Sequence, residues 1–148
     1  MEWLKWGTFD TPLVDNLLCH DIALAVSAFS NVTSCDIKSQ SGQETPVDAL
    51  TSEFKSGEDV VATSHINRSS KEKRKRVRAI GTGGTTLVWE DELLFEEVLG
   101  VLQPIEIEAI RSLEAECRAF IKSIETGQEE ESNGAFAVKI RTLLDSIQ

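Results

Sequence analysis

The sequence predicts a mainly α fold, a small helical protein in which a flexible basic linker precedes a C-terminal three-helix unit. Two observations carry this prediction. Apolar residues recur at three- and four-residue steps near both ends of the chain, and a central stretch is rich in Ser, Thr, Gly and charge. The 148 residues, 41% of them hydrophobic, suffice for one modest core. We therefore divide the chain into residues 1–56, 57–88 and 89–148.

The N-terminal segment, residues 1–56, contains two helix-start signals. Thr11 can accept a bond from a free backbone N–H, and Pro12 suits the first helical position, where a missing N–H is harmless. Apolar residues at helical spacing then predict a helix that ends near Asn31. A second Thr-Pro pair at residues 45 and 46 predicts a shorter helix, which Gly57 can end.

The central segment, residues 57–88, is predicted to be a flexible linker. It has few large apolar side chains, so it cannot bury enough surface to offset the entropy of ordering. The glycines of residues 81–84 are interpreted as a hinge. They do not indicate a phosphate-binding loop, because no buried strand precedes them and no Gly-Lys-Ser/Thr follows.

The C-terminal segment, residues 89–148, shows three apolar stripes. The first follows Trp89 and is acidic at its start, which complements a helix dipole. Pro104 separates it from a second stripe that stops before Gly127, and a third runs from Phe136 to Ile147. Three helices with short connections can close a small antiparallel bundle.

The distribution of charge predicts a targeting signal. The chain is acidic, with a net charge of −10, yet six of its fifteen Lys and Arg residues lie within residues 71–78. An accessible basic run of this density indicates binding to a nuclear import receptor, with contact to nucleic acid as the alternative. A pI near 4.7 argues against a general nucleic-acid-coating role. The residues assigned to import are Lys71, Lys73, Arg74, Lys75, Arg76 and Arg78.

A second pattern has the spacing of a nuclear export signal. It consists of Val98, Val101, Ile105 and Ile107. The same spacing is common in amphipathic helices, so core packing is the alternative. Together with the import run, it suggests shuttling between nucleus and cytoplasm.

Catalytic and metal-binding patterns are not found, and we expect neither an enzyme nor a cofactor. Cys19, His20 and Cys35 lack the spacing of a zinc site. A Cys19–His20 nucleophile pair stays open as an alternative. The three cysteines do not form a disulfide framework. No stretch approaches the roughly 18 apolar residues of a membrane span, so no membrane contact is expected.

The N-terminal sequence resembles a viral protein family. Met-Glu-Trp-Leu-Lys-Trp-Gly-Thr-Phe-Asp at residues 1–10 and Cys-His-Asp-Ile-Ala-Leu-Ala-Val at residues 19–26 are similar to the seventeen-kilodalton non-structural accessory proteins of the fusogenic avian and bat-type orthoreoviruses. The resemblance implies a shuttling protein of the infected cell that acts on host growth control or translation. The family's import signal lies nearer the C-terminus, so the import role of residues 71–78 rests on their own composition.

The sequence therefore predicts a nucleus-directed, shuttling regulatory accessory protein, viral and non-structural, located in the nucleus and cytoplasm of a host cell. Its expected partners are an import receptor and unidentified host regulatory proteins. Two alternatives stay open: a nucleic-acid-binding module that uses the basic run, and a structural or assembly protein whose amphipathic helices self-associate.

Overall fold

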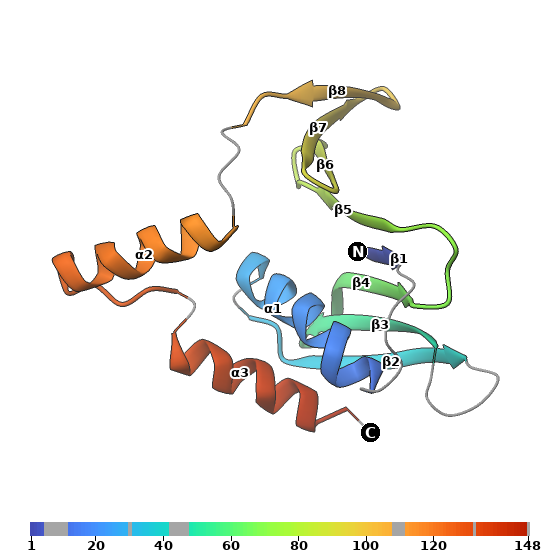
Figure 1. Cartoon of the computed structure of the whole chain (residues 1–148). Helices are drawn as coiled ribbons and strands as arrows, with labels where there is room; N and C mark the ends of the chain where they lie inside the picture. Colours follow the sequence, from blue (N-terminus) through green and yellow to red (C-terminus); the bar gives the residue numbers. More distant parts are fainter. Residues whose placement is uncertain (5–11, 30, 42–47, 108–111, 132, 148) are drawn as a thin grey trace.

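The computed structural model describes residues 1–4, 12–29, 31–41, 48–107, 112–131 and 133–147. Its central feature is one eight-stranded β-sheet with helices on one face (Figure 1). The strands are β1 (Glu2–Leu4), β2 (Ser34–Ser41), β3 (Ala49–Ser56), β4 (Asp59–Asn67), β5 (Arg74–Ile80), β6 (Thr86–Glu90), β7 (Leu93–Val98) and β8 (Val101–Ile105). The helices are the π-helix η1 (Val14–Leu18), α1 (Cys19–Ala28), α2 (Ser112–Thr126) and α3 (Gly134–Asp145).

The short strand β1 joins two antiparallel halves of the sheet. The strand order is β2-β3-β4-β1-β5-β6-β7-β8. β1 runs parallel to β4, with Trp3 opposite Ile66, and antiparallel to β5, with Trp3 opposite Lys75. The pairs within β2–β4 and within β5–β8 are antiparallel, so each half is a meander of consecutive strands.

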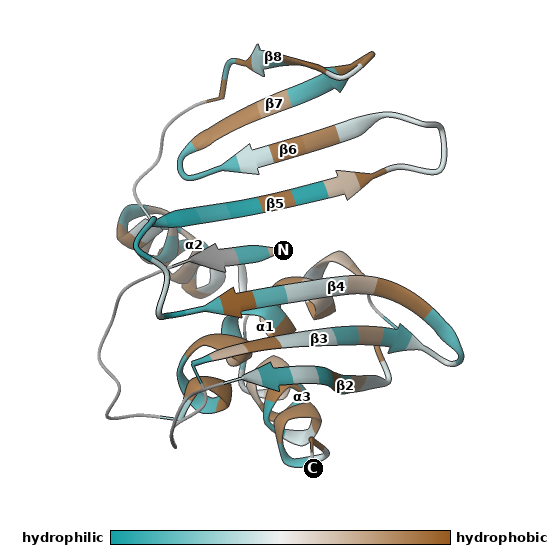
Figure 2. Ribbon diagram, turned by 90° about the vertical axis from the view of Figure 1, so that its right-hand side faces the viewer, coloured by the Kyte–Doolittle hydropathy of each residue, from teal (hydrophilic) through white to brown (hydrophobic). Residues whose placement is uncertain are grey.

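The hydrophobic core lies between β2–β4 and the helices α1 and α3, which sit behind these strands in Figure 2. β3 shows the alternation of a strand with one buried face, because Leu50, Ser52 and Phe54 are buried and their neighbours are not. The other half of the sheet rises away from α1 and α3 (Figure 1). The buried apolar core consists of Leu13, Leu18, Ile22, Ala25, Val26, Val32, Cys35, Leu50, Phe54, Ile66 and Leu143.

The β7–β8 hairpin ends the sheet at a protected edge. Leu99 and Gly100 both have positive φ values, 52° and 80°, as in the two-residue turns that match the twist of paired strands. Val98 and Val101 form the hydrogen-bonded pair that closes this turn. Every second residue after Val101, namely Leu102 and Pro104, therefore directs its backbone groups toward the free edge of the sheet. Pro104 offers no N–H there, which discourages another strand from adding to β8.

The predicted mainly α fold is wrong, because most of the central part of the chain forms strands. The predicted linker, residues 57–88, contains all of β4 and β5 and the start of β6. The helix expected after Trp89 is instead the series β6, β7 and β8, and Pro104 lies within a strand. Apolar residues at three- and four-residue steps here reflect two strands interrupted by a two-residue turn. The short helix expected from residue 45 is replaced by β3, although residues 45–47 lie outside the described part.

The other helix predictions are confirmed in type and approximate position. η1 and α1 occupy residues 14–28, although Thr11, the expected N-cap, lies outside the described residues. α2 stops before Gly127, whose φ of 67° is typical of a residue that ends a helix. The helices do not form the predicted C-terminal three-helix unit, because α3 packs against α1 and β2. Among the described residues, no helix is both long and apolar enough to cross a membrane.

The core position of Phe54 predicts a large loss of stability on truncation. Phe54→Ala should lower the free energy of unfolding by about 3–5 kcal/mol, because it removes a fully buried ring and leaves a cavity. Phe120→Ala is the matched control. Phe120 is 64% exposed, so its loss should change the free energy by less than about 0.5 kcal/mol. Urea unfolding followed by tryptophan fluorescence measures both, and equal effects would contradict this core assignment.

Candidate functional site

The junction of the π-helix η1 with α1 carries three polar side chains that are close together in the sequence. η1 runs directly into α1 and carries Asp15 on its first turn, with Cys19 and His20 following at the junction. Asp15 and His20 are exposed, and Cys19 is half-buried. Asp15 lies within η1, whereas His20 lies five residues later in the first turn of α1. Because π-turns within helices are frequent at functional sites, we define Asp15, Cys19 and His20 as the candidate site.

Burial of the opposite helix face fixes the orientation of the candidate site. Leu18 and Ile22 are fully buried against the sheet. Asp21 is also fully buried, and its carboxylate accepts a hydrogen bond from the hydroxyl of Ser64 on β4. These contacts fix the rotation of the helix about its own axis. His20, the neighbour of Asp21, is therefore exposed to solvent.

α3 brings a cation toward the candidate site. The Arg141 guanidinium pairs with Asp145 at 2.5 Å, and the pKa of Arg141 is raised mainly by this hydrogen bond and charge. The charge of Asp15 also raises that pKa, as a smaller cause. The site therefore combines an imidazole, a carboxylate and a nearby guanidinium.

The cysteines do not provide an activated nucleophile. Burial raises the pKa of Cys19, and the charges of Asp15 and Asp21 raise it further. Its thiol donates a weak hydrogen bond to the carbonyl oxygen of Asn16, at 3.7 Å. Cys35 lies in the core, where burial raises its pKa to about 11. Both are neutral thiols near pH 7, whereas a nucleophilic cysteine needs a lowered pKa. Within the described part of the chain, no group of His, Cys, Asp and Glu is arranged to hold a metal ion.

The basic run is part of a paired strand, not a flexible peptide. Lys71 and Lys73 are exposed in the turn before β5, whose backbone pairs with β1 and β6. Arg74 and Arg78 lie on the sheet face opposite the helices, and ion pairs join them to Glu90 at 3.5 Å and Glu97 at 3.0 Å.

The remaining two residues of the run are also engaged. Arg76 lies on the same face as Arg74 and pairs with Glu90 at 3.8 Å. Lys75 lies on the helix side, with its ammonium group 4.6 Å from the ring centroid of Trp89. The flexibility on which the import hypothesis relied is therefore missing, and the import role itself stays an untested prediction.

The export pattern is spread over a hairpin. Val98 and Val101 face each other across the β7–β8 turn, and Ile105 ends β8. Ile107 is 47% exposed beyond the strand. These residues therefore do not share a helix face, and their export role also stays an untested prediction.

The glycine-rich stretch does not fit a dinucleotide. Residues 81–85 connect β5 to β6 in a hairpin loop, in which the N–H of Gly81 donates to the carbonyl oxygen of Thr85. A pyrophosphate cradle needs a glycine-rich turn between a parallel strand and a helix N-terminus. Here antiparallel strands flank the loop, so this segment offers NAD or NADP no such cradle.

Comparison with known proteins identifies the fold. No protein-family model and no curated protein match the chain. UDP-N-acetylglucosamine 3-dehydrogenase from Acidithiobacillus ferrooxidans matches 99% of it with a TM-score of 0.84 at 14% identity, over 50% of that protein. A dehydrogenase from Clostridium difficile matches 97% with a TM-score of 0.72 at 19% identity, over 52% of its own length.

A third solved structure also matches almost the whole chain. Levoglucosan dehydrogenase, in complex with NADH and levoglucosan, matches 97% of the chain with a TM-score of 0.73 at 12% identity, over 53% of that protein. The chain thus spans about half the length of each of these proteins. At such identities the matches establish only that the chain shares its fold with about half of each of these proteins.

The matches correct the predicted identity and class of the protein. The resemblance to orthoreovirus accessory proteins is wrong, since the fold is shared with dehydrogenases and no sequence match supports a viral relative. The prediction of a nucleus-directed, viral, non-enzymatic regulator is overturned for the same reason. Sequence reasoning noticed Cys19 and His20 but passed over Asp15, because the π-helical geometry of η1 is not visible in the sequence.

The thiol environments predict an order of alkylation. With iodoacetamide at pH 8, exposed Cys117 should react first and Cys19 more slowly. Cys35 should react only after unfolding, because its site is buried and its pKa of about 11 leaves little thiolate. Peptide mass spectrometry over time gives the order. Labelling of Cys35 at the rate of Cys117 in the folded protein would contradict the described core.

Proposed function

We propose that this chain forms the substrate-facing half of an NAD(P)-dependent dehydrogenase that acts on a sugar hydroxyl. The observation that carries the proposal is the extent of the structural match, which includes 99% of this chain but only half of a dehydrogenase. The activity of the complete protein would then require a second half, which holds the dinucleotide.

The sheet supports assignment to the half that does not bind the dinucleotide. Dinucleotide-binding halves are doubly wound, with a mostly parallel sheet and phosphates at the carboxyl ends of its strands. In this chain the pair β1·β4 is parallel, whereas the pairs β3·β4, β1·β5 and β5·β6 are antiparallel. The glycine-rich loop is a hairpin, so no described glycine-rich turn can cradle a pyrophosphate.

The candidate site supports a role in proton exchange with a substrate. His20 is an exposed imidazole on a helix whose rotation is fixed by burial, and imidazole is the side chain most often used as a general acid or base. Asp15 supplies a carboxylate in η1, and Arg141 supplies a guanidinium whose pKa is raised in small part by the charge of Asp15. Together they can accept a proton from, or return it to, a hydroxyl oxygen.

The choice of substrate class follows the matched proteins. Two of the three act on or bind a carbohydrate, UDP-N-acetylglucosamine in one and levoglucosan in the other. A polar, exposed site of imidazole, carboxylate and guanidinium suits a substrate rich in hydroxyl groups. We therefore propose a sugar or a nucleotide sugar as the substrate class of this chain.

Titration of the two histidines by NMR tests this proposal. Levoglucosan and UDP-N-acetylglucosamine should shift the ring resonances of His20, whereas NADH should leave the isolated chain unchanged to millimolar concentration. His20→Ala should abolish the sugar response. His65→Ala is the matched control, because His65 is also exposed but lies on the opposite face of the sheet, where it pairs with Thr51.

Two results would contradict the proposal. Micromolar binding of NADH to the isolated chain would show that it contains the dinucleotide site. A sugar response confined to His65 would place the substrate on the other face of the sheet.

A further inference from the structure

α2 carries an apolar stripe that the rest of the described chain leaves exposed. Leu113, Cys117, Phe120 and Ile124 recur at four-, three- and four-residue steps, which places them on one helix face. Leu113, Phe120 and Ile124 are 71%, 64% and 66% exposed. Soluble proteins seldom leave a continuous stripe of this kind uncovered unless it binds something.

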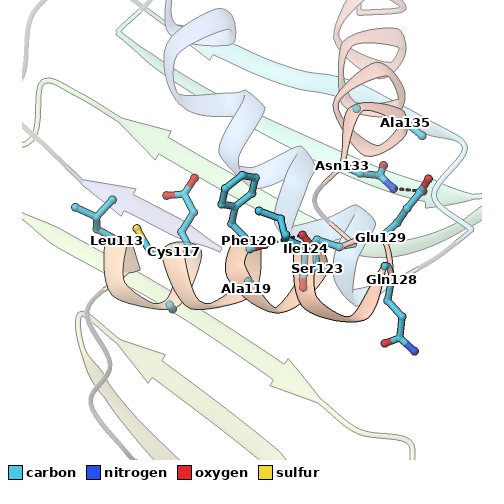
Figure 3. A pocket seen from close by; sticks show the side chains of 15 residues that line it. Leu113, Cys117, Ala119, Phe120, Ser123, Ile124, Gln128, Glu129, Asn133 and Ala135 are labelled. Carbon is cyan, nitrogen blue, oxygen red and sulfur yellow. Dashed lines mark hydrogen bonds between the residues drawn. The ribbon is translucent and has the colours of Figure 1, made fainter.

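The stripe forms one wall of an open groove. The connection to α3 and the first turn of α3 form the other wall, and the groove has a volume of about 1260 Å³ (Figure 3). Asn133 stabilises that wall, because its side chain accepts from the N–H of Phe136 at 3.1 Å and donates to Glu129 at 3.1 Å. We call this feature the α2–α3 groove, defined by the α2 stripe with Asn133 and Ala135.

The match to a solved dehydrogenase includes α2. α2 comprises 15 of the 148 residues, so a match that covers 99% of the chain includes it. The same match leaves half of the dehydrogenase outside it. A half of comparable length is therefore available to cover a surface that this chain leaves open.

The charge around the groove argues against a second copy as its occupant. Glu116, Glu129 and Glu130 line the groove, and no Lys or Arg is among the described residues that line it. The whole chain carries a net charge of −10. Two copies that met groove to groove would bring like charges together, so the groove fits an apolar surface with a basic rim.

We propose that the α2–α3 groove docks an apolar helix of the dinucleotide-binding half, with Lys or Arg residues at its border. This inference rests on the proposed function, since it names the surface at which the two halves meet. Doubly wound dinucleotide-binding folds carry helices on both faces of the sheet, so such a helix is available. Helix-in-groove contacts are anchored by apolar residues at the spacing found on α2.

Retention on NADH-agarose tests the docking surface. The tagged chain is mixed with extract of the cells that produce it, passed over the resin and eluted with free NADH. The wild-type chain should be retained from extract but not when purified. Phe120→Glu combined with Ile124→Glu should reduce retention at least tenfold, since buried anchors dominate such interfaces.

A matched variant controls for charge and folding. Lys122→Glu adds negative charge to the same helix on an exposed position outside the groove lining and should leave retention unchanged. No described residue of α2 is buried, so both variants should keep the circular dichroism and melting temperature of the wild type.

Each other outcome overturns the inference in a distinguishable way. Equal retention of the double variant would show that the dinucleotide-binding half docks elsewhere, while the proposed function stands. Absence of retention for the wild type in extract would overturn the docking surface, whereas the proposed function is decided separately by the His20 titration. Self-association of the purified wild type in sedimentation, abolished by the double substitution, would identify a second copy as the occupant.

Discussion

The fold depends on the pairing of β1 with two strands at once. Only three residues long, β1 joins β4 in a parallel ladder and β5 in an antiparallel ladder. Without it, each meander would expose a strand edge in the middle of the sheet, and such edges invite non-native pairing. Because β1 sets the register between the halves, it also decides which side chains of β5 share the helix face with Ile66.

This register places the three arginines of β5 on one face of the sheet. Arg74, Arg76 and Arg78 point away from the helices toward carboxylates on neighbouring strands, while Val77 lies on the helix side opposite Trp89. Each exposed ion pair contributes only about 0–1 kcal/mol. Their main consequence is that a strand rich in cations can lie in the middle of a sheet without uncompensated charge.

The two proposals assign different tasks to different surfaces. The η1–α1 junction exposes His20 and Asp15 because Asp21 and its apolar neighbours are buried against β4. The α2–α3 groove is a separate feature, apolar along one wall and acidic at its border. A dehydrogenase built from two halves needs both a surface that meets the substrate and a surface that meets the other half. The proposals place these two surfaces on different helices of this chain.

The sequence by itself located three helices, although it also predicted two that are strands in the structure. Period-3.6 stripes and a terminating glycine are local signals, and they located α1, α2 and α3 to within a few residues. The sequence also singled out Cys19 and His20, but not their relation to Asp15. Only the tertiary structure decided that residues 57–105 form strands, because β5 is a strand through its pairing with β1 and β6. Its arginines meet carboxylates that lie on other strands: Glu2, Glu90 and Glu97. A run of cations is unfavourable as an isolated strand and acceptable beside complementary carboxylates, so its conformation depends on neighbours that a local pattern does not contain.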